Sequence, residues 1–295
     1  MMKSNWIKLF AAAALVIPGM ISAEEPLRQE LRYNQVQQKA SHNSYQRREP
    51  LLVQLHDFKI RCIEFDIHAR PFAPAFDWWV YHNRKGDATV CDRLSECLTE
   101  VARFHQSEPE HEVLTIFFDV DGLGAPGHKK SDLYHQIEKF LPPASILKPG
   151  DLMTACPWAK TLQESVTRPG CGWPRLNDLK GKFILVVSGG SSSFAIPAYQ
   201  LDSELVFLVS RDTRPENMYN SPDRIFFNMP GPEPFASLVR EAGFVSRCYW
   251  LDSRTKYEKA AALGANLLAT DDLDPALFPW TRTDQTDGWP FKIIK

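Results

Sequence analysis

Residues 61–68 read Arg-Cys-Ile-Glu-Phe-Asp-Ile-His, a strand-like stretch in which polar and apolar side chains alternate. Successive side chains of an extended chain point to opposite faces. Three polar side chains therefore share one face: Glu64, Asp66 and His68. Three apolar side chains share the other: Ile63, Phe65 and Ile67. If the apolar face packs on helices, the carboxylates point into a barrel, where they need a cation or a proton; the alternative is a solvated edge strand.

Similar strand-like runs recur along the chain, at residues 36–41, 60–67, 78–81, 113–120, 183–187, 205–209, 244–250 and 267–270. Helix-like stretches lie between several of them, at residues 94–106, 131–140, 233–242 and 255–263. Strands that alternate with helices predict a parallel sheet in an α/β protein. About eight strands favour a single (β/α)8 TIM barrel over residues 24–295, with its working face at the strand C-terminal ends. Residues 225–227 compete with 205–209 for the sixth strand.

The composition of the 295 residues is that of a globular protein, which excludes collagen-like, low-complexity and wholly disordered classes. Lys and Arg number 34 against 36 Asp and Glu, a formal charge of −2. Without a basic excess we expect no binding to nucleic acid.

Residues 1–23 have the pattern of a secretory signal peptide. Lys3 and Lys8 precede a short uncharged stretch that ends at Ala23, just before two glutamates. The alternative, a membrane anchor, is disfavoured because the stretch is short and contains Pro18-Gly19. Removing 23 of the 295 residues leaves 272, and the loss of two lysines takes the formal charge from −2 to −4. We therefore expect an exported protein, periplasmic or secreted.

Six cysteines remain in the exported chain, where disulfides can persist. Cys91 and Cys97 lie in a polar segment, and Cys156 and Cys171 flank a stretch rich in Pro and Gly, so both pairs are candidate disulfides. The remaining two lie in apolar runs and are expected to be buried thiols: Cys62 and Cys248. No Cys-x2-Cys pair is present, which argues against a zinc site.

Polar residues stand at or near the ends of four predicted strands in the first half of the chain. They are His42-Asn43-Ser44-Tyr45, Glu64 to His68, Tyr81-His82-Asn83 and Asp119-Val120-Asp121. Each group alone has a structural explanation, such as a hydrogen-bonded histidine or an Asp-x-Asp-Gly turn. Together they would meet at one barrel mouth, and two imidazoles beside several carboxylates suit the cleavage of a phosphodiester. Oxygen ligands favour Ca²⁺ or Mg²⁺ over zinc.

These residues also carry a family resemblance. His42-Asn43-Ser44-Tyr45, Glu64-x-Asp66, Tyr81-His82 and Asp119 resemble the catalytic X half of phosphoinositide-specific phospholipase C. The chain is more similar still to the secreted bacterial calcium-dependent group. That likeness extends through Cys91-Asp92, Glu108-Pro109-Glu110-His111, Trp173-Pro174-Arg175-Leu176, Lys180-Gly181-Lys182, Gly264-Ala265 and Thr270-Asp271.

The resemblance implies a TIM barrel of the phospholipase C-like phosphodiesterase type, which binds Ca²⁺ and cleaves phosphatidylinositol-type phospholipids. Diacylglycerol and a cyclic or open inositol phosphate would be the products, with the inositol 2-hydroxyl attacking the phosphate. His42 would stabilise the phosphorane, and His82 would act as general acid. Four residues would bind the metal: Asn43, Glu64, Asp66 and Asp119.

The sequence departs from the family pattern at two places. The eukaryotic enzymes have Glu at the end of the fourth strand, whereas this chain has Asp119, with Asp121 two residues on. Either Asp is therefore a candidate ligand. Relatives often carry two arginines in the seventh strand, but here Arg247 is followed by Tyr249 at the alternate position. Candidates for headgroup contacts are Lys182, Arg247 and Tyr249; for Lys182 and Arg247 the alternatives are a surface lysine and a structural arginine.

Two rival functions stay open. A glycerophosphodiester or other lipid phosphodiesterase would use the same barrel and metal with another headgroup, and a non-catalytic barrel would bind phosphorylated ligands. The presence of both His42 and His82 beside the acids argues against the second. We expect a monomer, and any contact with a membrane surface to be transient. The aromatic segment 72–79 is a candidate for that contact, although a loop folded over the core, with Trp78-Trp79 in the third strand, is the preferred explanation.

Overall fold

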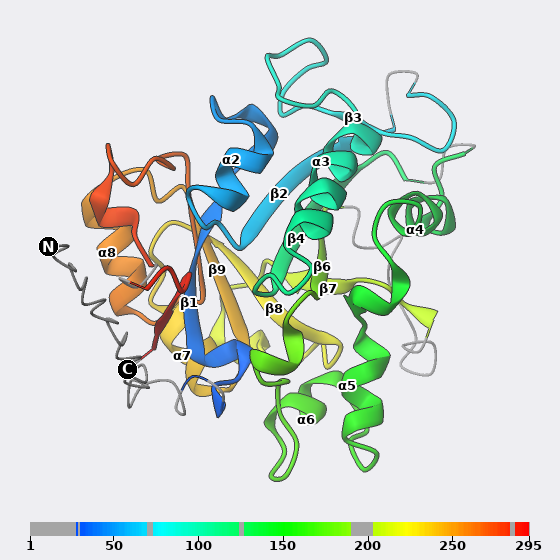
Figure 1. The fold of residues 1–295 in the computed structure, drawn as a ribbon. Coiled ribbons are helices and arrows are strands. Elements are labelled where there is room, and N and C mark those ends of the chain that lie inside the picture. Colours follow the sequence, from blue (N-terminus) through cyan, green and yellow to red (C-terminus); the bar gives the residue numbers. More distant parts are fainter. Residues whose placement is uncertain are drawn as a thin grey trace, which may run out of the picture.

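The computed structural model describes residues 28, 30–69, 73–123, 127–189, 203–283 and 287–294. Within them, eight parallel strands form a closed barrel, which confirms the predicted fold class (Figure 1). They are β1 (Val36–Ser41), β2 (Cys62–His68), β4 (Leu114–Asp121), β6 (Phe183–Ser188), β7 (Phe207–Ser210), β8 (Arg224–Pro230), β9 (Val245–Tyr249) and β10 (Leu267–Thr270). The expected signal peptide, residues 1–23, lies outside the described residues, so it stays a prediction.

The barrel closes where β1 meets β2, and this seam is narrow. The two strands are in register at one pair, Ala40 with Cys62. The rest of that edge of β1 is taken by a short antiparallel strand, β11 (Phe291–Ile293), which pairs with residues 36–38. In Figure 1 this last strand, in red, lies beside the blue β1. By contrast, β2 and β4 pair along seven consecutive positions.

The predicted third barrel strand, residues 78–81, is not part of the barrel. Its core is β3 (Trp79–Val80), which pairs antiparallel with the end of β2. The parallel neighbour of β2 along its whole length is β4, which leaves no place for another strand between them. The predicted competition for the sixth strand was also wrong, because residues 207–210 and 224–230 are both strands and neighbours. A further short strand, β5 (Ile146–Leu147), pairs with the start of β6.

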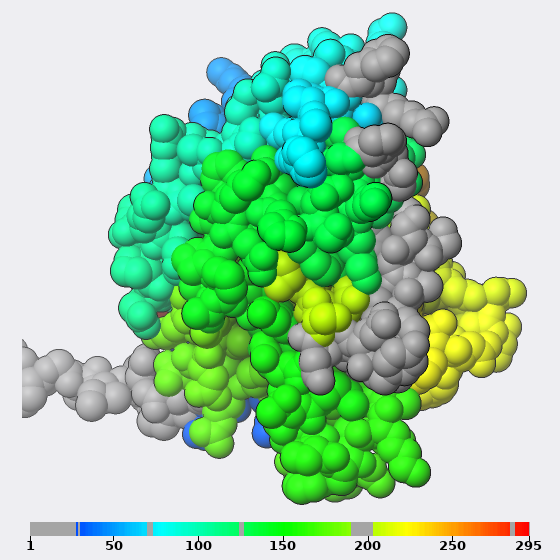
Figure 2. Space-filling model, turned by 90° about the vertical axis from the view of Figure 1, so that its right-hand side faces the viewer, coloured from blue at the N-terminus to red at the C-terminus, as the bar shows by residue number. Residues whose placement is uncertain are grey.

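Helices cover the outside of the barrel. They are α2 (Leu51–His56), α3 (Leu94–Ser107), α4 (Lys130–Glu138), α5 (Pro149–Ala155), α6 (Leu162–Thr167), α7 (Phe235–Glu241) and α8 (Arg254–Ala262). Three apolar side chains of β2 pack against α2 and α3 in one buried cluster: Ile63, Phe65 and Ile67. The prediction that the apolar face of β2 meets helices is therefore confirmed, and its polar face lies inside. Figure 2 shows a continuous green surface over α4, α5 and α6.

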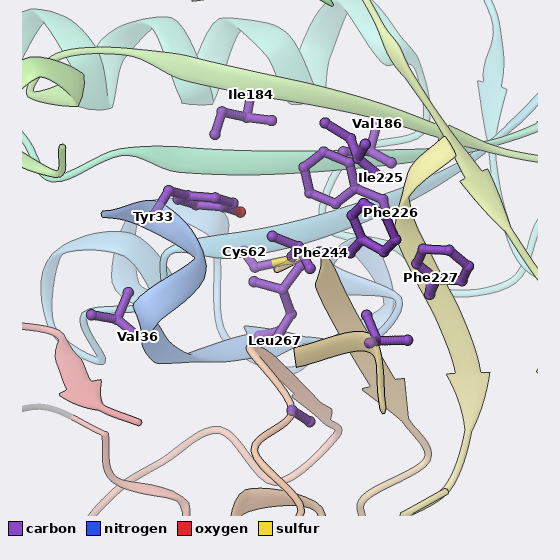
Figure 3. Packing of buried hydrophobic residues seen from close by; sticks show 14 of the residues in the cluster. Tyr33, Val36, Cys62, Ile184, Val186, Ile225, Phe226, Phe227, Phe244 and Leu267 are labelled. Atoms are coloured by element: carbon purple, nitrogen blue, oxygen red, sulfur yellow. The ribbon is translucent and has the colours of Figure 1, made fainter. Parts of the chain in front are cut away.

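Aromatic rings fill the N-terminal end of the barrel interior. The Trp173 ring lies 5.3 Å from Tyr33 and 5.4 Å from Phe226, measured between centroids, and all three residues are buried. The Trp173 indole donates to the carbonyl of Gly243 at 2.9 Å, so its polar atom is satisfied. Figure 3 shows Cys62, Phe226 and Leu267 gathering in the same interior from three different strands. This end of the barrel is a packed core, so a ligand has to enter from the other end.

The cysteines behave as the sequence predicted. Disulfides join Cys91 to Cys97 and Cys156 to Cys171. Cys62 and Cys248 are buried free thiols, and burial raises the pKa of each to about 12. Among the described helices, none is long and apolar enough to cross a membrane.

Candidate active site

The strand register brings the polar ends of β1, β2 and β4 together. Asp66 of β2 stands opposite Asp119 of β4, and Glu64 lies one step deeper on the same face. His42 follows β1 directly, and its backbone N–H donates to the carbonyl of Thr270 at 3.1 Å, next to the end of β10. His82 lies just after β3, and its side chain bonds Asp66 of β2. The predicted histidines and carboxylates therefore share one mouth of the barrel.

Glu64 is buried and held by an arginine from across the barrel. Arg247 of β9 donates through Nη2 to Glu64 Oε2 at 2.6 Å and through Nη1 to Asn228 Oδ1 at 3.0 Å. The backbone N–H of Asn43 donates to the same Glu64 oxygen at 3.0 Å. Burial opposes ionisation of Glu64, but the charge of Arg247 outweighs it and holds the pKa of Glu64 below its usual value. Glu64 is therefore an ionised carboxylate, and within the described chain its Oε1 accepts no hydrogen bond.

His42 is oriented by a carboxylate that follows β10. Its Nδ1 donates to Asp271 Oδ1 at 2.9 Å, and Arg47 bonds the same oxygen at 2.7 Å. Burial disfavours the charged form of Asp271, yet the hydrogen bond from His42 and the charge of Arg47 hold its pKa below the usual value. An ionised carboxylate can only accept, so the proton lies on Nδ1 of His42. The ring stacks on Tyr249 at 5.9 Å between centroids.

His82 has the same arrangement with a second carboxylate. Its Nδ1 lies 2.9 Å from Asp66 Oδ2, and its side chain is 44% exposed. The Asn43 side chain approaches the same ring nitrogen at 3.5 Å. The two imidazoles thus each bind a carboxylate through Nδ1, and among the described residues neither uses Nε2 in a hydrogen bond. Nε2 is consequently the atom of each ring that is left to bond a substrate.

Asp66 is the carboxylate with the least compensated charge. Burial raises its pKa first, the negative charges of Glu64 and Asp119 raise it further, and the hydrogen bond with His82 opposes them. The result is a pKa of about 6. Three carboxylates in one mouth therefore repel one another enough to favour a proton, or a cation in its place.

Asp119 and Asp121 differ in their position. Asp119 pairs with Arg211 of the segment after β7 at 2.8 Å and acts on Asp66 through its charge. Space for its carboxylate depends on Gly189, which has φ +72°, because a Cβ there would collide with Asp119 Oδ1. Asp121 points to His68 instead, at 3.4 Å, and its side chain is 76% exposed. Of the two candidates, Asp119 is the one that faces the other acids.

Of the predicted headgroup contacts, Lys182 lies away from the mouth and Arg247 is engaged by other side chains. Lys182 precedes β6, so it stands at the N-terminal end of the barrel, where its ammonium donates to the carbonyl of Ala144 at 2.6 Å. Arg247 is buried, and its guanidinium donates hydrogen bonds to Glu64 and Asn228. Arg247 thus fixes a carboxylate of the site. Tyr249 lies in the mouth beside His42.

Three residues that the sequence reasoning did not select complete the site: Asp271, Arg47 and Arg211. Asp271 directly follows the predicted strand 267–270, so the strand-end rule that selected the histidines would have found it. Arg211 likewise follows residues 207–210. Arg47 carried no such signal, because it lies in a turn whose path depends on the left-handed backbone of Asn43, with φ 46°.

The donor set suits a hard cation. Asn43, Glu64, Asp66 and Asp119 offer only oxygen ligands, the type that Ca²⁺ and Mg²⁺ take. The raised pKa of Asp66 is the mark of a negative charge that a cation would stabilise. In the described chain these side chains pair with Arg247, His82 and Arg211, and no three His, Cys, Asp or Glu are gathered as a ready ligand group. The residues fit a calcium ion in their chemistry.

The barrel is similar to solved structures of calcium-dependent phosphoinositol-specific phospholipase C from a Pseudomonas species. The apo form has a TM-score of 0.75 at 20% identity over 91% of this chain and 97% of that one. The myoinositol complex has a TM-score of 0.74 at 19% identity over the same shares. The fold is that of these phospholipases C.

A calcium-dependent phosphatidylinositol-specific phospholipase C from Streptomyces antibioticus is also similar. Its TM-score is 0.68 at 18% identity, over 85% of this chain and 97% of that one. No family model and no curated protein matches the chain. The resemblance seen in the sequence motifs is thus confirmed in the fold, over nearly the whole length of each phospholipase C.

Proposed function

We propose that the protein is a Ca²⁺-dependent phosphodiesterase that cleaves phosphatidylinositol-type phospholipids to diacylglycerol and an inositol phosphate. One observation carries the proposal: two imidazoles, His42 and His82, stand at one barrel mouth, each anchored through Nδ1 to a carboxylate. Anchored imidazoles with free Nε2 atoms are suited to donating protons and stabilising charge on a phosphate. The likeness to phospholipases C supports the choice of phosphodiester chemistry.

His82 is the proposed general acid. Its ring is partly exposed, and the hydrogen bond to Asp66 keeps the second proton on Nδ1, which leaves Nε2 to bond the substrate. An imidazolium held in this way gives its Nε2 proton to the departing alkoxide of diacylglycerol.

His42 is proposed to stabilise the charge that develops on the phosphoryl oxygens. Asp271 fixes its ring, and Tyr249 covers one ring face, so Nε2 points in one direction. Tyr249 also offers the aromatic surface on which an inositol ring would pack. Arg247 serves the reaction indirectly by keeping Glu64 ionised and in place.

The metal would be held by Asn43, Glu64, Asp66 and Asp119. When bound, Ca²⁺ neutralises phosphate charge and lowers the pKa of the attacking substrate hydroxyl. The protein contributes the site: Gly189 leaves room for Asp119, and Arg247 positions Glu64. An acid of this cluster is also placed to take the proton of the attacking hydroxyl.

The decisive experiment is ³¹P NMR of the purified protein with phosphatidylinositol and, separately, with glycerophosphodiesters. A cyclic inositol phosphate signal supports the proposed reaction. Cleavage of glycerophosphodiesters alone would assign the barrel to that other headgroup, and no reaction with any substrate would leave a ligand-binding barrel. His42→Ala serves as the matched inactive control.

The metal proposal predicts that a calcium chelator abolishes activity and that Ca²⁺ restores it. Asp119→Asn should weaken Ca²⁺ binding, measured by isothermal titration calorimetry, because it removes a charged ligand. Asp121→Asn is the matched control, and its binding should equal that of the wild type, since Asp121 faces His68. Full activity under chelation would contradict the metal assignment.

We also propose an exported, monomeric enzyme, periplasmic or secreted, that contacts membrane surfaces transiently. Two disulfides support an oxidising compartment. The formal charge of −4 expected after cleavage offers no general attraction to anionic membranes. Mass spectrometry of the exported protein tests the proposal, because its N-terminus should be Glu24.

A further inference from the structure

His68 contacts the backbone that carries the general acid. Its Nε2 lies 2.8 Å from the carbonyl oxygen of Tyr81, in the peptide group that joins Tyr81 to His82. Its Nδ1 lies 3.4 Å from Asp121. The ring stacks on the Tyr81 ring at 3.8 Å between centroids, with 7° between the planes. A carbonyl can only accept, so Nε2 of His68 carries a hydrogen and donates it.

We propose that His68 is a positioning residue for His82, which holds the general acid at the distance and angle that proton transfer requires. The role of His82 as general acid rests on the proposed function. The contact between His68 and the Tyr81 carbonyl rests on the geometry alone. No part of His68 reaches the reacting atoms, because both ring nitrogens are engaged by Tyr81 and Asp121.

Both backbone polar groups of Tyr81 are held by β2. Its N–H donates to the carbonyl of Asp66 at 3.3 Å, and its carbonyl accepts from His68. The residue before His82 is thus fixed on both of its sides, through two consecutive peptide groups, by residues two positions apart on one strand. Asp66 binds the His82 ring as well, so the same strand sets the backbone and the side chain of the acid.

The segment around His82 needs such a clamp. His42 directly follows a six-residue barrel strand, whereas the strand before His82 has two residues and lies outside the barrel. Stacking adds to the clamp, since Tyr81 is buried beneath the His68 ring although the next residues are exposed. A displacement of about 1 Å at a catalytic group costs about a hundredfold in rate, so the clamp has a measurable effect.

The test compares two substitutions that differ by one methylene group. His68→Gln can place an amide N–H where Nε2 was and keep the bond to Tyr81. His68→Asn places its amide near the Nδ1 position and loses that bond. On phosphatidylinositol we expect His68→Gln to stay within about threefold of the wild type and His68→Asn to lose about tenfold to hundredfold in kcat.

The leaving group separates positioning of an acid from general damage. An aryl inositol phosphate releases a phenolate, which needs little protonation, so His68→Asn should lose less than about threefold on it. In the double variant with His82→Ala, His68→Asn should add no further loss. Equal losses on both substrates, equal behaviour of the Gln and Asn variants, or losses that multiply in the double variant would overturn the proposal.

Hydrogen exchange decides the contact independently of activity. The N–H of Val80 donates to Asp92 and that of Tyr81 to Asp66, so both amides report on the clamp. Exchange at these amides should be faster in His68→Asn than in His68→Gln, which should match the wild type. Identical exchange in all three proteins would refute the clamp. If the wild type cleaves no phosphodiester, the proposed function fails, while this measurement still decides the role of His68.

Discussion

The N-terminal end of the barrel interior is filled by aromatic rings, whereas the C-terminal end carries carboxylates, imidazoles and a buried arginine. At the aromatic end the packing is largely apolar, and the buried Tyr33 hydroxyl bonds Thr115 at 2.6 Å. At the charged end the negative charges of Glu64 and Asp119 help to raise the pKa of Asp66. The same eight strands thus support a packed core at one end and a chemically active cluster at the other.

The largest expected effect is at the charged end. His82→Ala should lower kcat on phosphatidylinositol by about a hundredfold to ten-thousandfold, the usual contribution of a general acid. The loss on an aryl ester should be much smaller, and the urea midpoint should hardly change, because the side chain is 44% exposed. Equal losses in kcat on both esters would show that His82 is not the general acid.

The converse change belongs to the aromatic end. Trp173→Ala should lower the free energy of unfolding by about 3–5 kcal/mol, since it removes a fully buried ring from the core. The Trp173→Ala protein that remains folded should keep the kcat of the wild type. Activity measured with and without urea, corrected for the folded fraction, checks this. Trp173→Phe is the matched control and should lose less stability. A specific loss of kcat in Trp173→Ala would show that the two ends are coupled.

A smaller effect is expected for Asp271→Asn. The amide can still accept from His42, but it lacks the negative charge of the carboxylate. The resulting loss in kcat should be about tenfold to hundredfold, as for other partners that orient a functional imidazole. Rates on the two esters should fall alike, which distinguishes His42 from His82. Unchanged kinetics would mean that Asp271 has no part in catalysis.

The smallest expected effect concerns pH and a histidine at the N-terminal end. Burial lowers the pKa of His111 to about 4, with His105 and Arg61 lowering it further. The unfolded chain therefore takes up the proton first as the pH falls below 6.5. Stability should decrease by about 1 kcal/mol between pH 7 and 5.5. His111→Gln should remove most of this slope in urea titrations; an unaltered slope would assign it to other groups.

The comparison also explains what the sequence could predict. Alternation in residues 62–68 placed Glu64 and Asp66 inside the barrel, since period 2 follows from an extended backbone. Strand direction was sufficient to place His42 at the mouth, and applied to residues 183–187 it would have placed Lys182 at the N-terminal end of the barrel. These features are local, and local patterns predicted them.

Other features depend on tertiary structure. Residues 78–81 have strand composition, but composition does not indicate which strand is the partner or whether it runs parallel. The bond between Arg247 and Glu64 joins β9 to β2 across the interior, and no spacing within either strand predicts it. The charge distribution at the mouth follows from barrel closure, so it became visible only in the structure.

The narrow seam between β1 and β2 affects the order in which the barrel folds. Residues 36–38 find their partners in residues 291–293, at the opposite end of the sequence. Contacts so distant along a chain form late, because closing a long loop is entropically unfavourable. If the chain is exported unfolded, as the proposed signal peptide implies, the barrel would stay open until its last strand has crossed the membrane, and calcium outside would reach the proposed site as it closes.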